Sequence, residues 1–81
     1  MERSEAGKWR SLGAYLRQLR LDASVAKGDL AEWLGWDEGQ IERLETYPDG
    51  LELLQLIDYA QALEADLVQV LRSCKDILRC N

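Results

Sequence analysis

The sequence predicts a compact all-α fold, a five-helix bundle. Three observations lead to this fold class: apolar residues recur at helical spacing in five segments, no segment alternates apolar and polar residues like a half-buried strand, and Pro48 is the only proline. The chain has 81 residues, of which 47% are hydrophobic and 31% charged. This length suffices for one small core and is too short for two.

The first two helices are predicted over residues 11–22 and 27–34. Ser11 is a suitable N-cap for the first helix, and its leucines fall on one face. The second helix ends at Gly35, because a glycine just past a helix permits the positive φ of the next turn. Residues 1–10 are polar, and we expect them to be flexible.

Three more helices are predicted over residues 38–46, 51–63 and 66–78. Asp37 caps the first of these, and Pro48 with Gly50 forms the loop that follows it. The fourth is rich in leucine and alanine, and the fifth carries an apolar stripe. The predicted organisation is therefore a flexible segment, one domain and a tail: residues 1–10, 11–78 and 79–81.

Residues 27–46 read KGDLAEWLGWDEGQIERLET and carry a helix-turn-helix pattern. Ala31 is small, as required where the next helix crosses directly over it, and Gly35 permits a sharp turn. Ile41 and Leu44 bury the inner face of the second helix of the motif.

This pattern resembles the phage-repressor/Cro-type (XRE) helix-turn-helix family, and the likeness extends over about residues 11–72. The flanking matches are Leu12-Gly13, Leu19-Arg20 and Ala60-Gln61-Ala62-Leu63. The resemblance implies a stabilising ion pair between Arg20 and Glu45, and it implies that Ala31 and Gly35 are structural. It also assigns the candidate DNA-binding positions, which are Lys27, Gln40, Arg43 and Thr46.

The charge argues against DNA as the main partner. Residues 26–50 contain two basic and seven acidic residues, a net of −5 that equals the net charge of the whole chain. A carboxylate ~6 Å from a phosphate costs roughly 0.7 kcal/mol even in bulk-water dielectric. Glu38 stands where the family usually has a polar base-reading residue, and Asp49 stands in a loop that usually carries lysine or arginine.

Two functions of different classes follow. The first is a small transcription-control protein that binds and inhibits a partner protein, such as a transcription activator, which would make it an antiactivator. The alternative is a DNA-binding repressor that binds operator DNA as a dimer, with help from Arg3 and Arg10. The first is favoured because phosphate neutralisation supplies most non-specific DNA affinity, and the acids oppose it.

The candidate protein-binding residues combine aromatic and acidic side chains: Trp33, Glu32, Glu38, Glu42 and Tyr47. For Tyr47, packing within the loop after the third helix is an equal alternative. Trp33 lies ~200° around its helix from the inward-facing Ala31, so it should be exposed. An exposed tryptophan beside acids is typical of a protein-binding hot spot. Trp36 is expected in the core, whereas Trp9 either anchors the N-terminal segment or joins the same surface.

Several classes of function are not expected. The chain has no histidine and only two cysteines, Cys74 and Cys80, so a histidine-based triad and a four-ligand zinc site are excluded. We expect no catalytic residues, no metal and no cofactor. No apolar run approaches the ~18 residues of a membrane span, and no export signal is recognisable, so a cytoplasmic protein with reduced thiols is expected.

Overall fold

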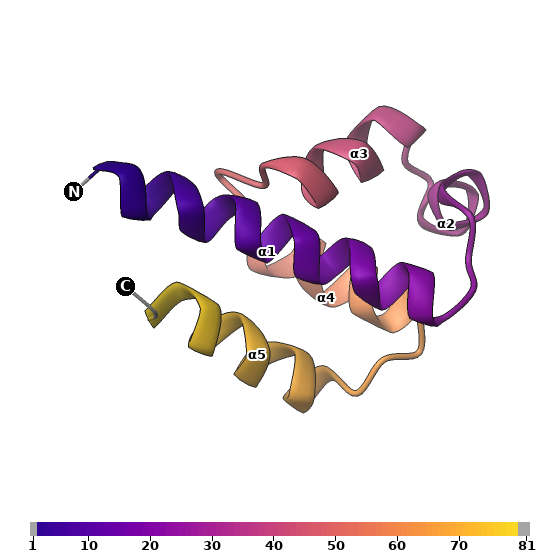
Figure 1. The fold of residues 1–81 in the computed structure, drawn as a ribbon. Helices are drawn as coiled ribbons and strands as arrows, with labels where there is room; N and C mark the ends of the chain where they lie inside the picture. The colour runs from indigo at the N-terminus through magenta and orange to yellow at the C-terminus, as the bar shows by residue number, and fades with distance from the viewer. Residues whose placement is uncertain (1, 80–81) are drawn as a thin grey trace.

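The computed structural model describes the backbone of residues 2–79 and the side chains from residue 7 onward. The described residues form five α-helices (Figure 1), which confirms the predicted all-α fold. Their bounds are α1 Glu2–Asp22, α2 Lys27–Leu34, α3 Glu38–Thr46, α4 Leu53–Ala62 and α5 Leu67–Arg79.

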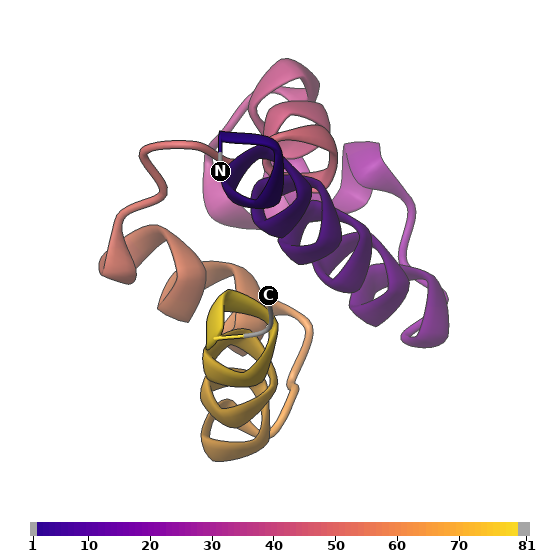
Figure 2. The same cartoon turned by 60° about the vertical axis from the view of Figure 1, so that its left-hand side comes forward.

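Helix α1 is the central element of the bundle. It contacts α3 on one side and α5 on the other, while α4 contacts both α2 and α5. Figures 1 and 2 show that α1 begins and α5 ends at the same end of the molecule. The helices enclose one core of buried apolar residues: Leu12, Leu16, Leu30, Ala31, Ile41, Leu44, Leu56, Tyr59, Ala60, Leu63, Val70 and Cys74.

The start of α1 differs from the prediction. The helix begins at Glu2, so Ser11 lies inside it and is not an N-cap. The segment expected to be flexible is therefore helical from residue 2. Trp9 gives the physical reason, because its half-buried side chain packs against the core and holds this part of α1 in place. Of the two interpretations of Trp9, anchoring is the correct one.

The fourth helix, α4, is shorter than predicted, and its first two leucines do not face the core. It begins at Leu53, and both Leu53 and Leu54 are exposed, at 62% and 70%. Its buried residues are Leu56, Tyr59 and Ala60, which share one helical face. The leucine-rich start of α4 therefore contributes surface rather than core.

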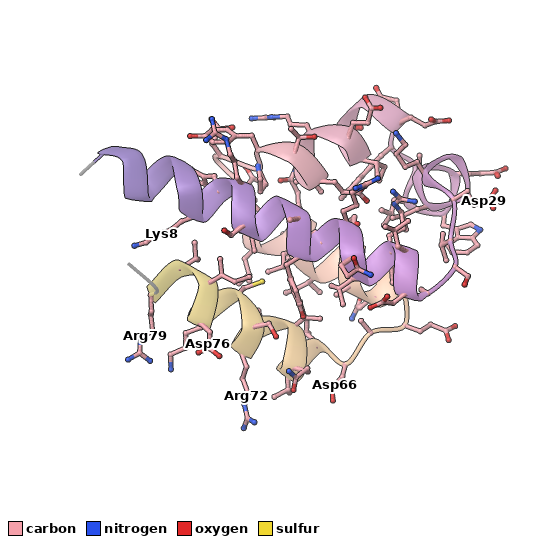
Figure 3. All side chains as sticks on the ribbon, viewed as in Figure 1. Lys8, Asp29, Asp66, Arg72, Asp76 and Arg79 are labelled. Atoms are coloured by element: carbon pink, nitrogen blue, oxygen red, sulfur yellow. The ribbon has the colours of Figure 1, made fainter. Side chains whose placement is uncertain are left out.

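Helix α5 packs its apolar stripe against α1 and α4. Val70 and Cys74 are buried, and Ile77 is half-buried against the core. Arg72, Asp76 and Arg79 project away from the bundle (Figure 3). Arg79 ends α5 and is not part of a tail, and residues 80–81 lie outside the described residues. None of the described helices is both long and apolar enough to cross a membrane.

Candidate functional site

A buried ion pair joins α1 to α3. Arg20 Nε donates to Glu45 Oε2 over 2.7 Å, and Arg20 Nη2 donates to Glu45 Oε1 over 3.0 Å. Arg20 Nη1 also donates to the backbone oxygen of Val25 over 2.9 Å, which fixes the chain between α1 and α2. Only 6% of Arg20 and 8% of Glu45 is exposed. The predicted contact between these two residues is confirmed.

Tyr59 of α4 completes this network. Its hydroxyl lies 2.6 Å from Glu45 Oε2 and 2.8 Å from the backbone oxygen of Leu16. The hydroxyl has one proton, and the charged carboxylate is the stronger acceptor, so it donates to Glu45. Burial raises the pKa of Tyr59 well above its ordinary value, and the hydrogen bond to Glu45 raises it further. The hydrogen bond to Glu45 likewise raises the pKa of Arg20.

Sequence reasoning missed Tyr59. The available signal was its place on the same face of the fourth helix as Leu56 and Leu63, because a buried phenol needs an acceptor. The network links α1, α3 and α4, and it keeps Tyr59 neutral and Arg20 charged. Its effect is to set the position of α3 relative to the rest of the bundle.

Gly13 allows α1 and α3 to cross closely. A Cβ at this position would lie 2.9 Å from the backbone carbon of Glu45, and 3.0 Å from the carbonyl carbon and oxygen of Thr46. Because these neighbours are backbone atoms, a side chain would force the two helices apart. The end of α3 is thereby held directly on the middle of α1.

The turn of the helix-turn-helix motif has its predicted features. Gly35 adopts a left-handed conformation with φ of 72°, and Ala31 is buried at the crossing. The backbone N–H of Trp36 donates to the oxygen of Ala31 over 2.9 Å. Trp36 is half-buried and packs against the core, as expected. Ala26 precedes α2 and provides no side-chain cap.

The start of α3 is closed by a capping box. Asp37 Oδ1 accepts from the backbone N–H of Gln40 over 2.9 Å, and Gln40 Oε1 accepts from the N–H of Asp37 over 3.2 Å. The predicted cap is confirmed. Its consequence is that the amide oxygen of Gln40, a candidate DNA-reading residue, is turned back onto its own helix.

Both cations of the motif lie beside acids. Lys27 Nζ is 2.8 Å from Glu42 Oε2, and this hydrogen bond lowers the pKa of Glu42. Arg43 Nη2 donates to the backbone oxygen of Asp49 over 3.2 Å and lies 3.9 Å from its carboxylate. The Arg43 side chain is nevertheless 69% exposed. Lys27 is therefore engaged across the two helices, whereas Arg43 remains accessible.

Two open grooves meet at the C-terminal end of α3. The α3 groove, of about 330 Å³, is lined by Gly39, Glu42, Arg43, Thr46 and Tyr47. The arginine groove, of about 700 Å³, lies between α1 and α3 and is lined by Arg10, Ala14, Arg17, Gln18, Glu45, Thr46 and Tyr47. The two grooves share Thr46 and Tyr47. Sequence reasoning did not single out Arg17, although it lies seven residues after Arg10 and so on the same face of the helix.

The predicted protein-binding residues do not gather in one patch. Trp33 is exposed, at 59%, and Glu32 beside it is exposed as well. A Cβ on Gly28 would lie 3.1 Å from Glu38 Oε2, and Trp33 lies about 140° around α2 from Gly28. Trp33 and Glu38 thus occupy different sides of α2. Tyr47 is farther away, because it follows the C-terminal end of α3 whereas Glu38 begins that helix.

The cysteines and acids offer no reactive centre among the described residues. Cys74 is a free thiol, and burial raises its pKa, so it is poorly suited to act as a nucleophile. Cys80 lies outside the described residues. Among the described side chains, those of residues 7–79, no three or more Cys, Asp or Glu residues are grouped so that they could hold a metal ion.

Comparison with known proteins assigns this arrangement to a family. The helix-turn-helix domain family matches residues 11–72, the segment that contains the ion pair, the turn and α3. Members of this class are typically regulators and not enzymes. None of the curated proteins matches the chain. The chain belongs to the helix-turn-helix domain family and is of the XRE-like type.

Proposed function

We propose that this protein is a transcription regulator that binds operator DNA as a dimer, with α3 as its recognition helix. Two observations together support the proposal. The chain belongs to the helix-turn-helix domain family, and the described residues leave the outer face of α3 open. A recognition helix must enter the major groove, and a dimer reads two half-sites.

Arg43 and Thr46 are the side chains best placed to contact DNA from α3. Arg43 is largely exposed, and it is held by one exposed hydrogen bond to the backbone oxygen of Asp49, which a base edge would have to replace. Arginine pairs with guanine by two parallel hydrogen bonds. Gly39 adds no side chain to the α3 groove and permits close approach. Lys27 would contribute only if DNA displaced Glu42.

The net negative charge of the chain determines which kind of DNA binding we propose. A net charge of −5 weakens attraction to random duplex, because that attraction depends on phosphate neutralisation. Affinity must then come from base contacts at a defined sequence. We therefore expect a large ratio of specific to non-specific binding rather than strong binding to any duplex.

A selection experiment tests this proposal. The full chain is used to enrich binding sites from a random duplex library, and the enriched site is compared with a scrambled one. Arg43→Ala should weaken binding to the enriched site by about 5- to 150-fold, the range of about 1–3 kcal/mol for a base contact. Arg72→Ala on α5 is the matched control and should bind like the wild type. Failure to enrich any sequence contradicts DNA binding.

A second function, inhibition of a partner protein such as a transcription activator, is supported by Trp33. An indole that is 59% exposed beside Glu32 and Asp29 has the composition of a hot spot with an acidic rim. Asp29 points away from the bundle in Figure 3. Trp33→Ala should weaken binding of a partner captured from the native host by roughly 30-fold, or ~2 kcal/mol, without unfolding the domain. Normal binding by the folded variant would exclude this surface.

A further inference from the structure

We infer that Arg10 and Arg17 form a second phosphodiester-binding element on α1, outside the helix-turn-helix motif, which holds the DNA backbone beside the C-terminal end of α3. This inference rests on the proposed DNA binding. It assigns the arginine groove a ligand class, and it adds Arg17 to Arg10, which the sequence already suggested as a DNA contact.

The geometry of α1 places the two arginines at opposite ends of one groove. Arg10 and Arg17 are seven residues apart, so they share a helical face and lie about 10.5 Å apart along the axis. Gly13 and Ala14 lie between them, and α3 crosses closely over Gly13. Ala14 lines the groove between the arginines, whereas Gly13 is covered by α3. The separation equals the axial rise of roughly three base-pair steps of 3.4 Å.

Both arginines lack an acidic neighbour on α1. Residues three and four positions away in a helix are the natural ion-pair partners. For Arg10 these residues are alanine and glycine, and for Arg17 they are Gly13, Ala14, Arg20 and Leu21. Among the described side chains, neither arginine takes part in an ion pair. The other cations of this region, Arg20, Lys27 and Arg43, all lie beside carboxylates.

The acids near the arginine groove are already neutralised. Glu45 lies at its inner wall, but its carboxylate accepts both hydrogen bonds from Arg20. Glu42 of the adjoining α3 groove is bound by Lys27. Together with Arg10, Arg17 and Arg43, and with Asp49 counted beside Arg43, the charged side chains around the two grooves have a net positive charge, although the chain as a whole is acidic.

The position of the arginine groove favours DNA over other anions. It is continuous with the α3 groove through Thr46 and Tyr47, so a duplex seated on α3 would bring its backbone across these two residues. Arginine offers a planar fork that matches two phosphate oxygens. Trp9, which packs on the core, keeps the preceding turn of α1 in place, so that Arg10 is presented from an ordered helix.

The test is a salt titration with a charge-matched control. Binding of the full chain to the enriched duplex is measured by fluorescence anisotropy across a range of salt concentrations. The Arg10→Ala/Arg17→Ala variant is compared with Arg72→Ala/Arg79→Ala, which removes two exposed arginines at the same spacing from α5, where both point away from the bundle. Alanine favours helix in both cases, so circular dichroism should show that both variants keep their fold.

The expected result is a change in the salt slope confined to the α1 variant. Each phosphate contact contributes about 0.9 to the slope of log K against log salt, so losing two should reduce it by about 1.8. The corresponding loss of affinity is about 60-fold at ~0.1 M salt, and it should be equal for the enriched and the scrambled duplex. The α5 variant should keep the wild-type slope.

Three results would overturn the inference. An unchanged slope in the α1 variant, with Arg43→Ala still weakening binding, removes the α1 element and leaves the proposed function intact. An equal loss in the α5 variant shows an effect of net charge alone. Binding of the wild type to polyglutamate but not to any duplex makes the groove a site for acidic protein and also contradicts the proposed function.

Discussion

Replacing Glu45 by glutamine should destabilise the domain strongly. The change preserves the size of the side chain but removes the charge that balances Arg20, which is only 6% exposed. Breaking a buried ion pair by removing one partner costs about 3–5 kcal/mol, because the other charge stays buried and unbalanced. A domain of 81 residues has a total stability of about 4–12 kcal/mol. The substitution should therefore remove a quarter or more of it.

Urea and thermal unfolding followed by circular dichroism measure this loss. The midpoint temperature of Glu45→Gln should fall by at least about 12 °C, at about 4 °C or more per kcal/mol. Glu42→Gln, which disrupts the exposed pair with Lys27, should leave stability almost unchanged. Arg20→Met/Glu45→Leu should recover most of the loss, since no charge stays buried and the Tyr59 hydroxyl still has Leu16 as an acceptor. A Glu45→Gln variant within about 1 kcal/mol of the wild type would refute this reasoning.

Three other perturbations address the packing and the caps, all measured by urea unfolding. Gly13→Ala should destabilise the domain by about 1–3 kcal/mol, because its Cβ would clash with α3. Gly7→Ala, whose Cβ would meet open space, should stabilise the domain by about 0.5–1 kcal/mol. Equal effects of the two substitutions would contradict the close crossing of α1 and α3. The folded-state pKa of Tyr59 is raised above its unfolded value of 10.0. The contribution of Tyr59 to the free energy of unfolding is therefore complete below pH 10 and declines above it. The wild type should accordingly lose about 1 kcal/mol more than Tyr59→Phe between pH 10 and about pH 11, and parallel pH profiles would disprove this. Asp37→Ala should cost about 1 kcal/mol by removing the capping box of α3, and no change would mean that the cap is redundant.

The frame of the motif could be predicted because its signals are local. A glycine at position 35 and a capping aspartate at position 37 each report a backbone requirement of their own turn, and a small residue at position 31 indicates the crossing of the helix that follows directly in the chain. The Arg20–Glu45 pair is a long-range contact, but the family resemblance supplied it. Tyr59 had no such guide. Its partners come from α1 and α3, and nothing in the spacing of the fourth helix indicates which acceptors lie opposite.

The early start of α1 could not be predicted for a similar reason. Residues 2–8 are polar and include Gly7, which on intrinsic propensity argues against a helix. What overrides this preference is packing of Trp9 on the core, a tertiary contact that the sequence left as one of two alternatives. The arginine groove depends on this extension, since Arg10 belongs to it. The candidate site was therefore only partly visible in the pattern of residues.

Net charge proves to be a poor guide to the surface around α3, because the acids of residues 26–50 are not equivalent. Glu45 is buried against Arg20, Glu42 is bound by Lys27, and Asp49 lies beside Arg43. Asp29 and Glu32 lie on α2, and Asp37 and Glu38 lie at the N-terminal end of α3. The accessible cations gather instead at the C-terminal end of α3. The same acidic total is thus compatible with two surfaces of opposite character, one suited to phosphate and the other, around Trp33, suited to a basic protein.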